Sequence, residues 1–77
     1  MSKRIAPIHW KLFECVILAH GFKCVRHKGS HRSYTKPGVL RPVVIPTYDK
    51  FTPFLIKTNL KTAGISRDLY FTYLKDC

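Results

Sequence analysis

Apolar residues recur at intervals of three and four near the start of the chain, which is typical of an amphipathic helix. We expect this helix to run from Pro7 to His20, because proline suits a first helical turn and Gly21 supplies a left-handed stop. The residues expected to form its apolar side are Ile8, Leu12, Cys15 or Val16, and Ala19.

The last third of the chain predicts two more helices. The second runs from Pro53 to Thr62 and ends at Gly64, and Ser66 is expected to be the N-cap of the third. The predicted apolar positions are Phe54, Leu55, Leu60 and Ala63 in the second helix, and Leu69, Tyr70, Tyr73 and Leu74 in the third.

Between these helices the pattern shortens and predicts three strands. Phe22 to Lys28 and His31 to Lys36 flank Gly29-Ser30, where a first glycine suits the type II′ turn of a hairpin. Val39 to Pro46 forms the third strand, and Pro42 limits part of it to a sheet edge or bulge.

In a hairpin with a two-residue loop, Arg26, Lys28 and His31 share one face, and Val25 pairs with Tyr34 on the other. We expect Val25 and Tyr34 to be buried and the basic residues to be exposed near the turn. The whole chain, residues 1–77, is then one α+β domain in the order α-β-β-β-α-α, a three-stranded antiparallel sheet with helices on one face.

Fourteen Lys and Arg residues stand against four Asp and Glu, giving a formal charge of +10. This excess predicts nucleic acid, an acidic protein, or both as partners; the alternative is a merely soluble basic protein. The longest apolar stretch, Leu12 to Ala19, is too short to span a bilayer and lacks a small-residue cleavage site. We therefore expect a cytoplasmic protein without a membrane partner.

Three cysteines make an odd set without paired spacing, whereas a disulfide scaffold uses an even and denser set. We expect them to be reduced, with Cys15 and Cys24 in the core and Cys77 on a fraying terminus. The four acids are scattered and no Cys or His pair has zinc-binding spacing, so neither a metal nor another cofactor is expected.

The predicted hairpin turn is the segment whose residues indicate a catalytic site, because His31 lies there among cationic side chains. An imidazole titrates near neutrality, with an ordinary pKa of about 6.5, and nearby positive charge attracts phosphate. RNA supplies its own nucleophile, the 2′-hydroxyl, so a base, an acid and positive charge suffice to cleave it. The candidate catalytic residue is His31, and the candidate phosphate ligands are Arg26, Lys28, Gly29, Ser30 and Arg32.

Several short motifs extend this hypothesis to most of the chain. In order they are Gly21-Phe22, Val25-Arg26, Lys28-Gly29-Ser30-His31, Tyr34, Val44-Ile45-Pro46 and Ala63-Gly64-Ile65-Ser66. From about Ile8 onward the chain resembles the HicA (YcfA-like) toxins. This resemblance implies a small bacterial mRNA interferase with a fold like the double-stranded-RNA-binding domain, a catalytic His31, and inhibition by a cognate HicB antitoxin.

The sequence departs from that family at two places. Many relatives carry a histidine where this chain has Tyr48, and many carry Gly-Thr-Leu-Arg where it reads Ile56 to Leu60. No role is assigned to Tyr48, Asp49 or His27.

The predicted function is that of a toxin that cleaves mRNA with His31 as general acid and base. An acidic antitoxin would cover the rim around His31 and set the oligomeric state. The alternative is a non-catalytic basic module that binds structured RNA by its shape, in which the histidine only helps to bind phosphate.

Overall fold

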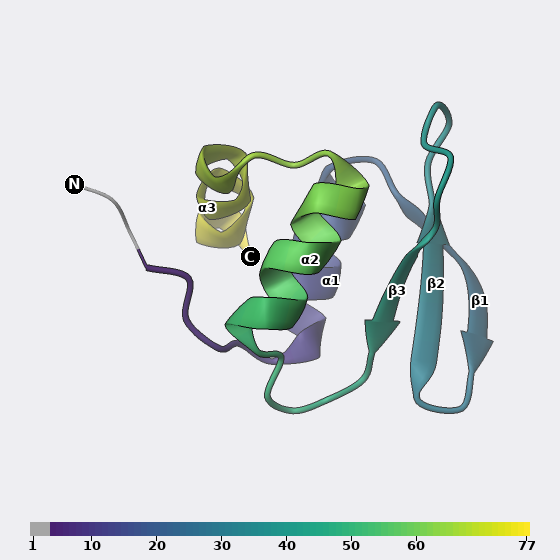
Figure 1. Cartoon of the computed structure of the whole chain (residues 1–77), viewed down its shortest axis with the longest axis horizontal. Coiled ribbons are helices and arrows are strands. Elements are labelled where there is room, and N and C mark those ends of the chain that lie inside the picture. The colour runs from purple at the N-terminus through teal and green to yellow at the C-terminus, as the bar shows by residue number, and fades with distance from the viewer. Residues whose placement is uncertain (1–3) are drawn as a thin grey trace.

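The computed structural model describes residues 4–77, which form three helices and one three-stranded sheet (Figure 1). Their order is α1 (Trp10–Ala19), β1 (Lys23–Lys28), β2 (His31–Thr35), β3 (Val43–Pro46), α2 (Pro53–Ala63) and α3 (Arg67–Asp76). The sheet is antiparallel, with β2 between β1 and β3. The predicted α+β class and element order are therefore confirmed.

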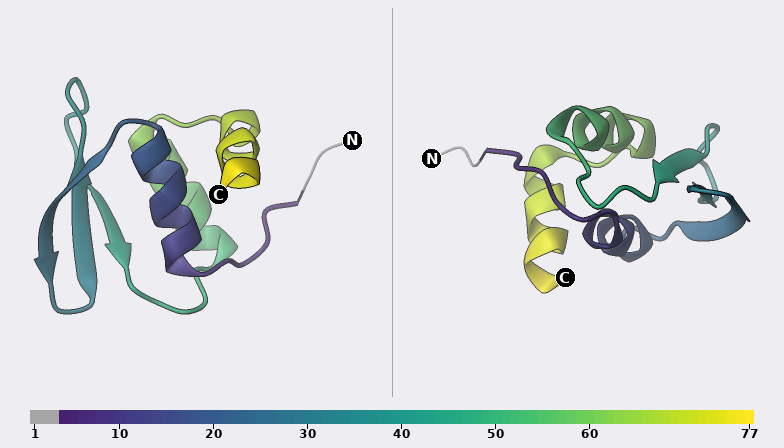
Figure 2. Two further views of the ribbon diagram at one scale, coloured as in Figure 1. Left: turned by 180° about the vertical axis from the view of Figure 1, so that it is seen from behind. Right: turned by 90° about the horizontal axis from the view of Figure 1, so that it is seen from below.

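The helices lie on one side of the sheet, and its other face is open (Figures 1 and 2). Helices α1 and α2 lie against the sheet, and α3 packs on α1 beyond them. The core between these layers includes Phe13, whose ring stacks on that of Phe51 with centroids 4.8 Å apart. The largest fully buried side chains are Tyr34, Tyr70, Phe13, Phe51, Ile17, Ile45, Ile56, Val16 and Val43.

The hairpin has the expected turn but a different register on its first strand. Lys28 pairs with His31 as predicted, but Cys24, not Val25, pairs with Tyr34 because a β-bulge lies between Cys24 and Arg26. The extra residue shifts the alternation of side chains by one position. The predicted burial of Tyr34 is confirmed, whereas that of Val25 is wrong, since Val25 is 60% exposed.

The first helix begins later than the Pro7 start predicted for it. Ile8 pairs with Phe51 through two backbone hydrogen bonds, of 3.1 and 2.6 Å, which hold the segment before the helix in an extended bridge. His9 becomes the N-cap, its Nδ1 accepting a hydrogen bond from the Lys11 N–H at 3.1 Å.

The buried side of α1 also differs from the prediction. It consists of Phe13, Val16 and Ile17, while Leu12 and Ala19 are exposed. Of the predicted apolar positions within the helix, Val16 is the one that reaches the core.

The third strand is shorter than predicted, because the chain turns and bends from Pro37 to Arg41 before pairing begins at Val43. Strand β3 is an edge strand, as the proline within its predicted range indicated. It ends at Pro46, opposite His31. The following Thr47 N–H donates to the Ser30 carbonyl, so His31 and Pro46 form a non-hydrogen-bonded pair. Pro46 therefore removes no hydrogen bond from the ladder.

The second and third helices follow the sequence closely. Helix α2 ends at Gly64 with a left-handed φ of 72°, and the Ser66 hydroxyl accepts from the Leu69 N–H at 3.1 Å to cap α3. The exception is Phe54, predicted to be on the apolar side of α2 but 75% exposed. Ile56 is fully buried in its place.

The cysteines contradict the prediction that all three are reduced. Cys15 and Cys77 form a disulfide that joins α1 to the C-terminal end of the chain, across a sequence separation of 62 residues. Cys24 is a free thiol, but it is exposed and does not fill the core. The C-terminus is thus covalently attached to the helical layer.

Candidate active site

His31 is the first residue of the central strand and follows a tight turn. Gly29 has a φ of 58°, a left-handed conformation that glycine adopts at no steric cost and that a primed hairpin turn requires. The imidazole is exposed, and its Nδ1 lies 3.5 Å from the Ser30 hydroxyl oxygen. Its Nε2 has no hydrogen-bond partner within residues 4–77 and is accessible to a ligand.

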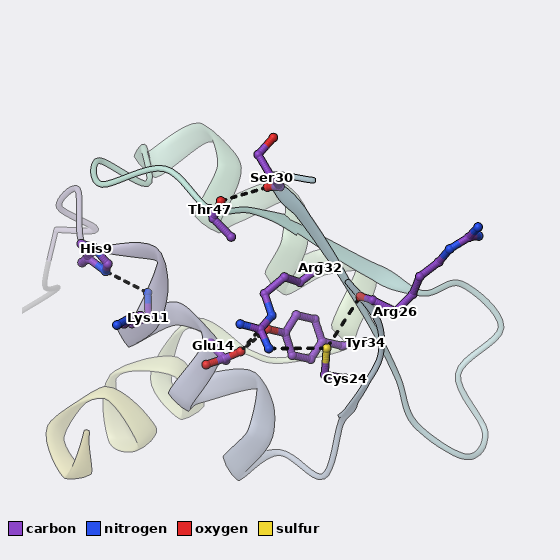
Figure 3. A network of polar contacts seen from close by, with 9 residues as sticks. All are labelled: His9, Lys11, Glu14, Cys24, Arg26, Ser30, Arg32, Tyr34 and Thr47. Carbon is purple, nitrogen blue, oxygen red and sulfur yellow. Dashed lines mark hydrogen bonds and ion pairs between the residues drawn. The ribbon is translucent and has the colours of Figure 1, made fainter. Parts of the chain in front are cut away.

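The turn before His31 is attached to the end of the third strand by Thr47. The Ser30 carbonyl accepts two hydrogen bonds from Thr47, one from the backbone N–H at 2.8 Å and one from the hydroxyl at 3.2 Å. The bond from the hydroxyl is drawn in Figure 3. These bonds fix the peptide unit that leads into His31. Sequence reasoning missed Thr47, because its contact depends on the register between β2 and β3.

Two of the predicted phosphate ligands share the open face of the sheet with His31. Lys28 lies directly opposite His31, and Arg26 lies opposite Ser33. Paired residues in an antiparallel ladder point to the same face. Both basic side chains are exposed, and Arg26 extends away from the helices (Figure 3).

The bulge adds a third basic residue to this row that sequence reasoning did not include. Lys23 pairs with Thr35, which lies two residues beyond Ser33 and four beyond His31, so Thr35 points to the same face as these two residues. Without the bulge, Lys23 would alternate to the other face from Arg26 and Lys28. The open face therefore carries Lys23, Arg26 and Lys28 along one strand, beside the strand that begins with His31.

Arg32, a further predicted ligand, lies on the opposite face and contacts the helices. Its Nε is 3.6 Å from the Glu14 carboxylate, and its guanidinium lies 5.4 Å from the centre of the Trp10 ring. It also donates to the Cys24 sulfur at 3.9 Å, a contact that raises the pKa of Arg32 above its ordinary value, and the charge of Glu14 adds to this effect. Arg32 therefore remains cationic but is bound within the protein (Figure 3).

The same carboxylate holds Tyr34, the buried residue two positions further along β2. The Tyr34 hydroxyl donates a hydrogen bond to Glu14, so one acidic side chain of α1 is shared by Tyr34 and Arg32. Burial raises the pKa of Tyr34, and the bond to Glu14 raises it further. This phenol therefore stays neutral and acts as a donor that ties the sheet to α1.

The three residues to which the sequence assigned no role lie outside the group formed by His31 and the basic residues of the open face. His27 is exposed and pairs with Arg32 on the helix-facing side, away from His31. Asp49 forms an ion pair with His9 at 3.4 Å, and Tyr48 is 51% exposed. No group of three or more His, Cys, Asp or Glu residues arranged to hold a metal ion occurs in the part of the chain that the structure describes.

The described helices, all within residues 4–77, include none long and apolar enough to cross a membrane.

Comparison with known proteins matches the chain to a family model. The family model described as "HicA toxin of bacterial toxin-antitoxin" matches residues 10–65, which include α1, the whole sheet, α2 and the turn before α3. No match was found to a curated protein or to a solved structure.

Proposed function

This chain belongs to the HicA toxin family of bacterial toxin–antitoxin systems, and from that membership we propose that it is an endoribonuclease that cleaves mRNA at His31. One observation carries the proposal. An exposed imidazole follows a turn that Thr47 holds in place, on the same face of the sheet as exposed cations. This arrangement combines a proton-transfer group with a phosphate-binding surface.

In the proposed reaction, Nε2 of His31 takes the proton of the RNA 2′-hydroxyl. The 2′-oxygen then attacks the adjacent phosphorus, the bond from phosphorus to the 5′-oxygen breaks, and the imidazolium protonates that leaving oxygen. The products are a 2′,3′-cyclic phosphate and a 5′-hydroxyl. General acid–base catalysis contributes a factor of ~10²–10⁴ in rate, enough for one histidine to support a slow nuclease.

Positive charge would bind the phosphate and stabilise the charge that builds on it. Lys28, directly opposite His31, is the first proposed ligand, and Arg26 is the second. The backbone N–H groups of Gly29 and Ser30 are further proposed donors to a phosphate oxygen. Glycine has no side chain, so the phosphate is able to approach the backbone closely at this turn. Arg32 has to leave its ion pair with Glu14 to contribute, so we place it last among the proposed ligands.

The second partner is the cognate antitoxin that membership of this family implies. A chain with a formal charge of +10 attracts an acidic protein, and a partner that covers His31 and Lys28 would exclude RNA. We propose that inhibition works in this way and that the antitoxin sets the oligomeric state of the complex.

The proposal is tested by incubating a long single-stranded RNA with the wild type, His31→Ala and His27→Ala, all in EDTA. His27 is a matched control, because it is an exposed histidine next to the same turn but on the other face. We expect the wild type and His27→Ala to cut, and His31→Ala to lose ~10²–10⁴ in rate with an unchanged melting temperature. End analysis should find 2′,3′-cyclic phosphate.

Other outcomes would contradict specific parts of the proposal. Activity that disappears in EDTA and returns with Mg²⁺ would overturn the metal-independent mechanism. Equal RNA binding by all three proteins without cutting would favour the alternative function, a basic module that recognises structured RNA through phosphates and 2′-hydroxyls. The exposed basic row on β1 is the observation that supports this alternative.

A further inference from the structure

A second surface lies at the end of the sheet opposite His31. The segment between β2 and β3 projects beyond the strands, at the end where α2 terminates (Figure 1). A cavity of about 580 Å³ opens between this segment and the C-terminal end of α2. Val39, Leu40 and Ala63 supply its apolar lining, and Arg41 and Lys61 its charge. We call this surface the loop–helix groove.

The side chains of the loop–helix groove have the character of a protein interface. Leu40 is fully exposed, unlike any other large apolar side chain of the described chain, and exposed leucine surface is unfavourable in water. Arg41 and Lys61 are exposed beside it. An apolar contact flanked by cations is the combination that an acidic partner segment with a bulky apolar side chain would match.

RNA fits the groove less well. Single-stranded RNA is recognised mainly by stacking of its bases on aromatic or arginine planes, together with phosphate contacts. The residues that line the cavity include no aromatic side chain and a single arginine, Arg41, and the fully exposed Leu40 beside it is aliphatic. The chemistry of the lining therefore favours a protein partner.

We propose that the loop–helix groove is a docking site for an acidic, apolar segment of the antitoxin, separate from the antitoxin contact at His31. This inference rests on the proposed function for the identity of the partner. His31 begins β2 and Lys36 follows its last residue, so the two lie roughly 17 Å apart for five residues of extended chain. An antitoxin that contacts both ends gains from the high effective concentration of its second contact.

The test uses the purified cognate antitoxin as the probe and the double variant Leu40→Ser with Arg41→Glu. The matched control is Leu18→Ser with Lys75→Glu, which changes one exposed leucine and one exposed lysine in α1 and α3, outside the groove. Isothermal titration gives the affinity for the antitoxin, and RNA cleavage with and without antitoxin gives its inhibition. Melting curves check that every variant is folded.

We expect the groove variant to bind antitoxin at least about tenfold more weakly than the control, which corresponds to 1.4 kcal/mol. Its RNA cleavage without antitoxin should equal that of the control, because the groove is remote from His31. Equal affinity of the two variants for antitoxin would overturn the proposal. Weaker RNA cleavage by the groove variant alone, with unchanged antitoxin affinity, would assign the groove to RNA and also overturn it.

If the proposed nuclease function is wrong, the cleavage and titration experiments would give a different set of results from those that contradict the groove proposal. If the wild type cuts no RNA but still binds antitoxin, the titrations alone decide whether the groove is used. A groove variant that cuts normally and resists inhibition would support both inferences together.

Discussion

Strand β2 presents two kinds of surface, one on each side of the sheet. Toward the helices it presents Arg32 and Tyr34, and both of these side chains contact Glu14 of α1. Toward the open face it presents His31, whose ring contacts its neighbour Ser30 at 3.5 Å and is otherwise free to meet a ligand. Adjacent residues of the same strand therefore differ in whether their polar groups are already used inside the protein.

This difference separates stability from function. A polar group that is bonded within the fold contributes to stability, and its removal leaves a partner unsatisfied. An exposed group without a partner contributes little to folding, so its chemistry is available for a substrate. We accordingly expect substitutions on the helix side to lower stability, and substitutions on the open face to lower activity without affecting folding.

The largest stability effect on the helix side is expected for the Cys15–Cys77 disulfide. Cross-linking residues separated by 62 positions removes conformational entropy from the unfolded chain, which corresponds to about 4 kcal/mol in a chain-entropy account. We expect Cys15→Ser to lower the melting temperature by roughly 15 to 30 °C under oxidising conditions. Differential scanning fluorimetry measures this directly.

The free thiol provides the control for that experiment. Cys24→Ser should melt like the wild type, because Cys24 is exposed and forms no disulfide. A dithiol reductant should lower the melting temperature of the wild type to that of Cys15→Ser and leave that variant unchanged. A reductant that has no effect on the wild type would contradict the role given to the disulfide.

A more direct comparison of the two faces uses two basic residues that are near neighbours in the hairpin. Arg32→Ala loses a partly buried ion pair with Glu14 and a contact with Trp10, so we expect it to be less stable by about 1 to 2 kcal/mol. Lys28→Ala should unfold like the wild type, since Lys28 is exposed. Urea titration of both variants measures these free energies of unfolding.

The RNA affinities of these two variants should show the reverse pattern. Lys28→Ala should bind RNA more weakly and with a shallower salt dependence, by about one unit of slope per lost phosphate contact. A stronger loss of RNA affinity in Arg32→Ala than in Lys28→Ala would show that the helix-facing arginine is released to bind phosphate. That result would reverse the order of ligands proposed above.

Local signals in the sequence predicted most elements, because they depend on residues close together in the chain. Gly29 at the turn, Gly64 at the helix stop and the Ser66 cap are such signals, and all three lie where the sequence indicated. The pairing of Lys28 with His31 also follows from a two-residue loop. The turn before His31 and its pairing with Lys28 were therefore accessible without the structure, whereas the bonds from Thr47 were not, and the catalytic role of His31 remains a prediction.

The predictions were wrong where a contact between residues far apart in the sequence determines the local structure. The Ile8–Phe51 bridge delays the first helix, although Pro7 and the apolar spacing favour an earlier start. The bulge at Val25 shifts one strand by a residue and so changes which of its side chains face the helices. Cys15 and Cys77 are brought together only once α3 packs on α1. None of these contacts can be predicted from the spacing of apolar and polar residues near them in the sequence.

The helix side also contains a buried polar group that has no hydrogen-bond partner in the described part of the chain. The Tyr70 hydroxyl is buried and finds no hydrogen-bond partner among residues 4–77, and burial raises the pKa of Tyr70 to about 12. An unsatisfied buried hydroxyl is unfavourable, so we expect Tyr70→Phe to stabilise the protein by about 1 kcal/mol. Tyr34→Phe is the matched control, because that hydroxyl is bonded to Glu14, and it should destabilise by a similar amount. Chemical denaturation that shifts both variants in the same direction would contradict this distinction.

The smallest expected effect concerns His20 at the end of α1, where its Nδ1 lies 2.9 Å from the Tyr73 hydroxyl. Burial lowers the pKa of His20, and the charge of Lys36 lowers it further. The unfolded chain therefore binds a proton to His20 more readily than the folded protein does. Its contribution to stability is present above the unfolded pKa of about 6.5 and is lost as the pH falls through the lower folded pKa.

We expect the wild type to lose more stability between about pH 8 and about pH 5 than His20→Gln does, because the variant lacks this titration. His27→Gln, which changes an exposed histidine, should keep the dependence of the wild type. Urea unfolding at the two pH values measures the difference. A His20→Gln variant whose stability falls with acid as steeply as that of the wild type would show that other groups on the helix side carry the pH dependence.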